Sequence, residues 1–205
     1  MKNSLIIAAF FIAGILTGLL DVNWEEIPVD KLMQWTLYLL MLFVGLAFGS
    51  DPRIRDILRS AGFRLLLVPL TTIAGTFAGI FLYTLFFHYL RPVDAYAIGA
   101  GFGYYSLSSI LIAGFSGGEI AVIALLANVM REILTLLLSP VLVRFFGPLA
   151  PIASGGATSM DTTLPVIVKV SGKEYLVVSL VNGIILTILV PVIISLLYSG
   201  FPQPQ

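Results

Sequence analysis

The stretch SGGATSMDTTLPVIVKV, residues 154–170, places one carboxylate, Asp161, among glycines and hydroxyl side chains within an apolar region. An Asp at the centre of a bilayer costs about 2.5–3.5 kcal/mol on insertion scales. Glycine loosens a helix, and Ser, Thr and Asp offer competing local hydrogen bonds. Pro165 suits the first turn of a helix, where its missing N–H has no consequence. We therefore predict a broken helix in which Asp161 caps a half-helix inside a polar pocket.

The composition of the whole chain is that of a membrane protein. Of the 205 residues, 59% are hydrophobic and only 11% are charged, and the mean hydropathy is +1.04. A soluble domain carries about 25% charged residues, so lipid is the expected solvent. The chain has no cysteine, which excludes disulfides and thiolate metal sites. A net charge of zero gives no indication of a nucleic-acid partner, and we expect no cofactor and no metal.

Apolar runs long enough to cross a bilayer recur along the chain, because a crossing helix needs about 20 apolar residues. The runs are continuous, unlike the alternating ten-residue segments of a membrane barrel. The sequence therefore predicts an all-α, polytopic membrane protein forming a single transmembrane domain over 1–205, with about seven transmembrane segments, one or two of them broken. They lie near 4–20, 33–49, 65–88, 95–114, 119–143, 150–170 and 175–198. A signal peptide is the alternative for the first.

The distribution of basic residues predicts the orientation of these segments, since cytoplasmic loops are enriched in Lys and Arg. Four arginines lie within 53–64, so that loop and the N-terminus are expected on the cytoplasmic side. Seven crossings then put the C-terminus on the extracytoplasmic side. If 150–170 enters and leaves on one side instead, the C-terminus is cytoplasmic, but the charge bias favours the crossing. With seven crossings, the basic residues expected outside are Lys31, Arg91 and Arg144, whereas Lys169 and Lys173 fall inside.

A second interruption is expected in GAGFGYYSLSS, residues 99–109, where three glycines lie close together. Close helix packing is an equally good explanation for these glycines alone. However, both interruptions are followed by a long apolar helix, and secondary transporters place such breaks around the substrate and ion site. The candidate lining hydroxyls are Ser106 and Ser108 in the first break and Thr158 and Ser159 in the second.

A second intramembrane carboxylate, Glu132, lies about halfway along 119–143. Asn128 is four residues earlier, so the two share a helix face. Arg131 flanks that face, and adjacent residues of a helix do not face one another, so Asp161 is the better expected partner for Arg131 than Glu132. A static structural cluster is the alternative, but intramembrane ionisable groups are functional by default. Asn182 in the last span either belongs to the same site or makes a packing hydrogen bond.

Three stretches, GFGYYSLSSILI, NVMREILTLLLSPVLVRFFG and GATSMDTTLPV, in this order and spacing, resemble the lysine exporter family of bacterial and archaeal inner-membrane proteins. The family is similar at fold level to cation/proton antiporters and bile-acid-type transporters with crossed broken helices. The resemblance implies that Glu132 and Asp161 are the functional acids, with Asn128 beside them. Longer members carry a further hydrophobic N-terminal region, and seven spans leave an inverted repeat incomplete. A small membrane subunit or a homodimer is therefore expected to complete it.

These observations together predict a secondary active transporter of the cell inner membrane. The expected activity is export of a cationic amino acid, L-lysine, by antiport with protons, or with Na+ as the coupling ion. The alternatives are a monovalent cation/proton antiporter or an organic-anion carrier of similar fold. We do not expect an enzyme, because an aspartyl protease needs two aspartates that share a proton and Asp161 is the single mid-membrane aspartate of the sequence.

Overall fold

The computed structural model describes residues 63–200, together with isolated helical positions before residue 63. Contacts within the chain separate residues 1–36 from residues 37–205, and every helix from α4 onward belongs to the second unit. The predicted spans 4–20 and 33–49, and most of the arginine-rich segment 53–64, lie outside the described residues.

The described part of the chain is helical throughout, as predicted. Three of its helices, α4, α7 and α10, are long and apolar enough to cross a membrane, and the total of seven segments stays a prediction. In chain order the elements are α4 (Phe63–Phe86), α5 (Pro92–Gly99), α6 (Tyr105–Ser116), α7 (Gly118–Phe146), α8 (Ala150–Gly155), the 3-10 helix η2 (Gly156–Met160), α9 (Leu164–Ser171), the 3-10 helix η3 (Lys173–Tyr175) and α10 (Leu176–Gly200).

The three long helices match the continuous apolar runs at 65–88, 119–143 and 175–198. Helix α7 begins with Glu119 in its first turn and ends with Arg144 in its last, and both charges complement the helix dipole. Burial separates the three: 56% of the apolar window of α10 is buried, against 17% for α4 and 22% for α7. Helix α10 is therefore the central helix, and α4 and α7 present apolar faces outward.

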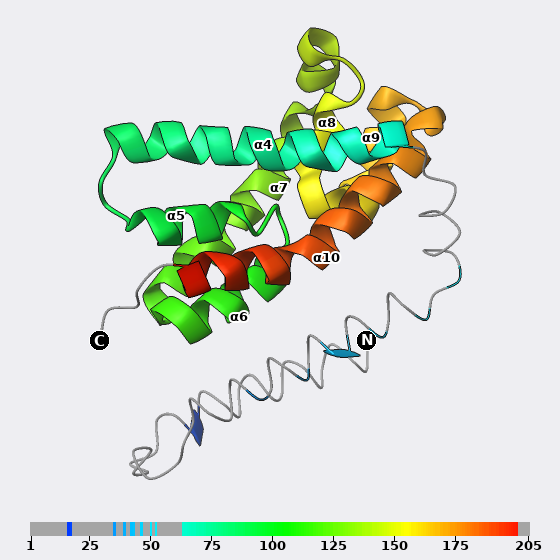
Figure 1. Ribbon diagram of the computed structural model, residues 1–205. Helices are drawn as coiled ribbons and strands as arrows, with labels where there is room; N and C mark the ends of the chain where they lie inside the picture. Colours follow the sequence, from blue (N-terminus) through cyan, green and yellow to red (C-terminus); the bar gives the residue numbers. More distant parts are fainter. Residues whose placement is uncertain are drawn as a thin grey trace. The chain divides into compact units, whose positions relative to one another are not determined.

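The segment predicted to cross as one broken span at 95–114 is instead a pair of helices whose outer ends meet. Ser116 at the end of α6 donates from Oγ to Oδ1 of Asp94, in the first turn of α5, over 2.7 Å. Arg91, just before α5, also donates from Nη2 to the Ser116 Oγ over 2.9 Å. The segment 92–116, here called hairpin 1, thus returns to the end of the bundle from which it starts (Figure 1).

We call the end where Asp94 and Ser116 meet end A, and the opposite end B. Helix α7 starts two residues after Ser116 and spans about 43 Å at 1.5 Å per residue, so it runs to end B. Tyr198, in the last turn of α10, donates to Asp94 over 2.9 Å, so α10 ends at end A and starts at end B. The segment 150–171 lies between the end of α7 and the start of α10. It therefore leaves from end B and returns to it, and we call it hairpin 2.

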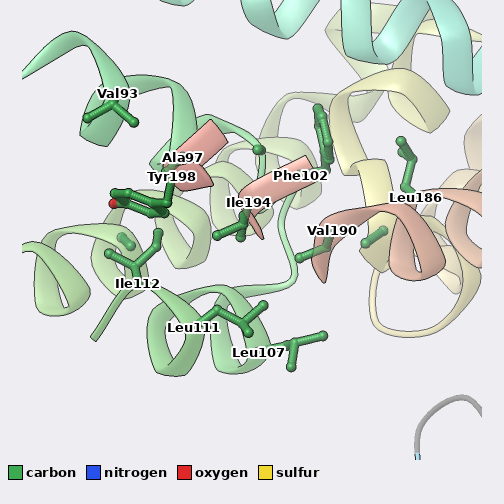
Figure 2. Packing of buried hydrophobic residues seen from close by; sticks show 13 residues of the cluster. Val93, Ala97, Phe102, Leu107, Leu111, Ile112, Leu186, Val190, Ile194 and Tyr198 are labelled. Atoms are coloured by element: carbon green, nitrogen blue, oxygen red, sulfur yellow. The ribbon is translucent and has the colours of Figure 1, made fainter. Parts of the chain in front are cut away.

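The bundle is thus a hairpin from end A followed by a long helix, and then a hairpin from end B followed by a long helix, with α4 packed against α10 (Figure 1). The two hairpin-and-helix units therefore run in opposite directions, an order that also occurs in proteins with inverted-topology repeats. Buried apolar side chains of hairpin 1 and of α10 form the core between the two repeats (Figure 2). The labelled members are Val93, Ala97, Phe102, Leu107, Leu111, Ile112, Leu186, Val190, Ile194 and Tyr198.

Candidate functional site

The tips of the two hairpins meet through one main-chain hydrogen bond. The amide of Ala157 in η2 donates to the carbonyl of Phe102, in the turn between α5 and α6, over 2.8 Å. Gly156, beside it, has a φ of 62°, and a Cβ added there would collide with the Phe102 carbonyl oxygen. Glycine is therefore required both by the left-handed backbone and by the close approach of the two chains. Both predicted interruptions exist, and the structure brings them together.

Asn128 of α7 holds the tip of hairpin 1. Its Nδ2 donates to the carbonyl of Ile98 over 2.9 Å, and its Oδ1 accepts from the amide of Gly103 over 2.8 Å. Asn128 is only 3% exposed. The side chain therefore supplies the acceptor for the Gly103 amide, and a second donor for the Ile98 carbonyl, which also accepts from the amide of Gly101.

Arg131, one turn further along α7, holds hairpin 2 instead. Its Nε donates to the carbonyl of Ser154 over 2.8 Å, and its Nη2 to that of Ala153 over 3.1 Å. The remaining Nη1 donates to Oγ1 of Thr76 on α4 over 3.2 Å. Our expectation that Arg131 pairs with Asp161 is wrong, since no such ion pair exists among the described residues. A fork of guanidinium donors satisfies the C-terminal carbonyls of α8, where positive charge is favourable.

Asn182 of α10 is the third side chain that fixes a tip. It is fully buried, and its Nδ2 donates to the carbonyl of Gly156 over 2.9 Å. Ser159 and Ser179 exchange hydrogen bonds between side chain and backbone of 2.9 and 2.7 Å, and thereby fasten η2 to α10. The predicted Asn182, Ser159 and Thr158 thus support the fold of the tip, because their hydroxyl and amide groups bond to its backbone. Further partners are Ile152 and Ser159 for Asn182, and Gly155 and Thr163 for Thr158.

Asp161 follows η2 and is exposed. Its Oδ1 accepts from the amide of Thr162 over 2.6 Å. Helix α9 begins three residues later, after Thr163, and no side chain caps it, so the predicted capping role of Asp161 is wrong. Pro165 does lie in the first turn of α9, as expected. Thr162 and Thr163 separate Asp161 from the start of α9, and its carboxylate is exposed.

The other predicted acid, Glu132, lies on α7 one turn beyond Asn128 and is partly buried. Its carboxylate makes no hydrogen bond or ion pair with any described residue. The hydroxyls of the first break differ from one another. Ser106 is exposed, whereas Ser108 is buried and donates to the carbonyl of Tyr105 over 3.3 Å. Of the two predicted acids, Asp161 thus keeps Oδ2, and Glu132 keeps both carboxylate oxygens, without a partner among the described residues, as Glu119 and Glu174 also do.

Several polar residues within the helices contact the hairpin tips but were not predicted from the sequence. Thr72 and Thr76 of α4 contact Asn182 and Arg131 respectively. Their four-residue spacing on one face of an apolar helix was a usable signal. Thr135 and Ser154 share a 2.7 Å hydrogen bond between α7 and hairpin 2. No local sequence pattern predicts this contact.

A charged cluster at end A was also missed. Asp94 is 1% exposed, and Arg91 donates to it over 2.6 and 3.0 Å, in addition to the bonds from Ser116 and Tyr198. Burial acts to raise the pKa of Asp94, but the hydrogen bonds from Arg91, Ser116 and Tyr198 outweigh it and hold the pKa below its ordinary value. The signal available was an Arg three residues before an Asp at the edge of an apolar run.

The pocket that the structure offers near this cluster is not the polar pocket expected around Asp161. It has a volume of about 290 Å³ and lies at the turn between α4 and α5. Its lining residues are Thr84, Phe87, His88, Tyr89, Leu90, Arg91 and Pro92. The described part of the chain has no group of three or more His, Asp or Glu side chains that could hold a metal ion.

Apolar long helices, inverted hairpins and irregular tips at mid-depth define a membrane transport protein. The chain belongs to the lysine exporter family, whose description is "Lysine exporter LysO" and whose model matches residues 8–198. It is 30% identical over 192 residues to a Haemophilus influenzae protein named as a candidate lysine exporter, covering 93% of this chain and 95% of that protein.

A second relative is "Lysine exporter LysO" of Escherichia coli K12, which is 30% identical over 197 residues. The match covers 94% of this chain but only 63% of the Escherichia coli protein, so the Escherichia coli protein is longer than this chain. No solved structure matches the chain. The predicted family resemblance is therefore confirmed by relatives in sequence.

Proposed function

We propose that this protein exports L-lysine by antiport with protons, and that Glu132 and Asp161 carry both the ammonium group and the proton. The supporting observation is that these two carboxylates are left without a basic partner in the described part of the chain, while Arg131 is engaged with backbone carbonyls. An intramembrane acid with no counter-ion is available to a mobile cation. In their ionised forms the acids bind the cargo ammonium groups, and a proton arriving from the opposite side displaces the cargo.

The orientation that fits this proposal places end B in the cytoplasm. Arg53, Arg55 and Arg59 precede α4 in the sequence and Arg64 is the second residue of α4, and Arg144, Lys169 and Lys173 fall at end B. Arg91 is the basic residue at end A in the described part of the chain. Opposed hairpins thus move Arg144 from the outside, where seven crossings put it, to the inside. Positive charge then concentrates on one side, as the positive-inside rule requires, and the C-terminus lies outside.

The inner membrane of the cell is the location that the family and the apolar helices favour. The expectation of a small membrane subunit or a homodimer also stays part of this proposal. Its support is that the described helices contain two inverted hairpin-and-helix units with α4 added.

The experiment is flux of labelled lysine in proteoliposomes across an imposed pH gradient. Asp161→Asn and Glu132→Gln each remove one ionisable group with little change in volume, so both are expected to lower flux by roughly tenfold or more. Glu119→Gln is the matched control, because Glu119 is exposed in the first turn of α7 and lies away from the tips. Undiminished export by either acid variant would overturn the assignment, and flux that ignores the pH gradient would overturn the coupling.

A further inference from the structure

Thr187, in the middle of α10, carries a buried hydroxyl that has no protein partner. The residue is 1% exposed, and its Oγ1 makes no hydrogen bond with any described residue. Other helical threonines of this chain, such as Thr72 and Thr135, donate to the carbonyl four residues earlier. A buried hydroxyl left unpaired costs about 1–3 kcal/mol. A hydroxyl without a protein partner at the centre of the most buried helix is therefore available to a ligand.

The face of α10 that carries Thr187 is turned toward both hairpin tips. Gly183, one turn before it, packs so closely on η2 that an added Cβ would lie 2.8 Å from the carbonyl oxygen of Ala157. Val190, three residues after it, belongs to the core cluster that contains Phe102 and Leu107 (Figure 2). Residues at positions i, i+4 and i+7 share a helix face. Thr187 therefore lies between the contact with hairpin 2 and the contact with hairpin 1.

A second set of unpaired groups occurs in the same region, at the N-terminus of α6. This 12-residue helix has no side-chain cap, and the amides of Ser106 and Leu107 have no acceptor among the described residues. Leu107 is itself 2% exposed and shares the core cluster with Val190, which lies on the turn of α10 that follows Thr187. Free amides at a helix N-terminus and the positive end of its dipole attract an anion.

From these two observations we propose a carboxylate subsite formed by the amides of Ser106 and Leu107 together with the Thr187 hydroxyl. It would take the α-carboxylate of an amino acid, while Glu132 and Asp161 take its ammonium groups, so it rests on the proposed transport function and deepens it. Every group at this subsite is a neutral donor, which suits an anion. The acids on α7 and after η2 suit the cationic end of the same molecule. The division of charge matches the two ends of a zwitterion.

The test compares ligands that differ in their charged groups, bound to the purified full-length protein by calorimetry. The ligands are L-lysine, 1,5-diaminopentane, which is lysine without its carboxylate, and L-norleucine, which lacks the side-chain ammonium. Thr187→Val is nearly isosteric and deletes only the hydroxyl, and Thr187→Ser restores it. Thr84→Val is the matched control, because Thr84 donates to the carbonyl of Phe81 near end A and lies outside the subsite.

Thr187→Val is expected to weaken lysine binding roughly tenfold, as for a lost hydrogen bond to a charged group. Binding of 1,5-diaminopentane stays unchanged, and Thr187→Ser binds lysine as the parent does. Equal weakening of lysine and 1,5-diaminopentane, or no change in lysine binding, would overturn the subsite while leaving lysine transport standing. Binding of norleucine that depends on Thr187, with no binding of lysine, would support the subsite and refute lysine as the cargo. Failure of all three ligands to bind would refute both.

Discussion

Hairpins 1 and 2 have the same design, but they are fastened at different places. Hairpin 1 is tied at its base by the buried Asp94 and at its tip by Asn128. Hairpin 2 has its fastenings near the tip, from Arg131 and Asn182, and its exposed acid, Asp161, comes directly after the fastened part. Hairpin 1 is therefore anchored to the bundle at both its base and its tip. Hairpin 2 holds a rigid η2 beside a turn that presents a free carboxylate.

Helices α7 and α10 each contact both hairpins. Helix α7 sends Asn128 to the first and Arg131 to the second, and α10 sends Tyr198 to the base of the first and Asn182 to the tip of the second. A disturbance of one tip therefore reaches the other through two helices as well as through the direct bond between Phe102 and Ala157. Both irregular segments therefore rest on the same supports, so a change at one tip can be coupled to a change at the other.

The largest expected effect concerns the direction of hairpin 1, and it is all or none. The chain has no cysteine, so single cysteines report position directly. Tyr89→Cys and Gly118→Cys lie on the two sides of hairpin 1, and both are expected to react with an impermeant thiol reagent from the same side of the membrane. Lys173→Cys at end B is expected to react from the other side. All three positions are exposed.

The cysteine-free parent is the control for that labelling. A hairpin keeps residues 89 and 118 together, whereas a single crossing over 95–114 separates them by the full bilayer. Labelling of Tyr89→Cys and Gly118→Cys from opposite sides would therefore remove hairpin 1, and with it the inverted repeat.

The next effect tests whether the two tips depend on each other. Gly156→Ala is expected to destabilise the protein by about 3 kcal/mol or more, because the new methyl group meets the Phe102 carbonyl and the φ of 62° is strained for alanine. Thermal unfolding in detergent micelles measures it. Gly118→Ala makes the same chemical change with nothing within 4 Å and is expected to stay within about 0.5 kcal/mol of the parent. Equal stability of the two variants would show that the tips are not in contact.

The smallest effect concerns the base of hairpin 1. Asp94→Asn is expected to cost about 1–3 kcal/mol near neutral pH, since a charged acceptor is lost from Arg91, Ser116 and Tyr198. The folded pKa of Asp94 is lowered, so its contribution is complete above the ordinary aspartate pKa of about 3.9 and is lost as the pH falls through the lower, folded value. Thermal unfolding from pH 7 downward should show the gap between parent and variant closing only in strong acid.

A constant gap at every pH would show that Asp94 acts through packing and not through its charge. Tyr198→Phe removes one neutral donor from the same carboxylate and is expected to cost less, about 1 kcal/mol.

The sequence predicted the parts of this fold that depend on local chemistry. Glycines and hydroxyls mark both interruptions, Pro165 marks the first turn of α9, and the continuous apolar runs mark α4, α7 and α10. It did not predict where each segment returns, because hydropathy is the same for a chain that crosses and for a chain that turns back. The contact that decides the direction of hairpin 1 joins Asp94 to Ser116, and neither residue lies in a recognisable motif.

The candidate site residues also divide into those that the sequence could predict and those that it could not. The position of Glu132 and Asp161 within apolar sequence was enough to single them out, since charge is rare there. The partner of Arg131 was not predictable, because backbone carbonyls are present in every segment and the sequence does not show that those of Ala153 and Ser154 lie beside α7. Thr187 has no sequence signal at all, since a threonine in an apolar helix ordinarily bonds to its own backbone.

The hydrogen bond between Tyr198 and Asp94 has a consequence for how the chain is made. These residues are 104 positions apart, so Asp94 is synthesised long before Tyr198 leaves the ribosome. Until then the hydrogen-bond partners available to its carboxylate are Arg91, directly before hairpin 1, and Ser116 at the end of it. The last turn of α10 thus adds the final hydrogen bond to a carboxylate made much earlier, and a nascent chain that stops before Tyr198 would leave that carboxylate without it.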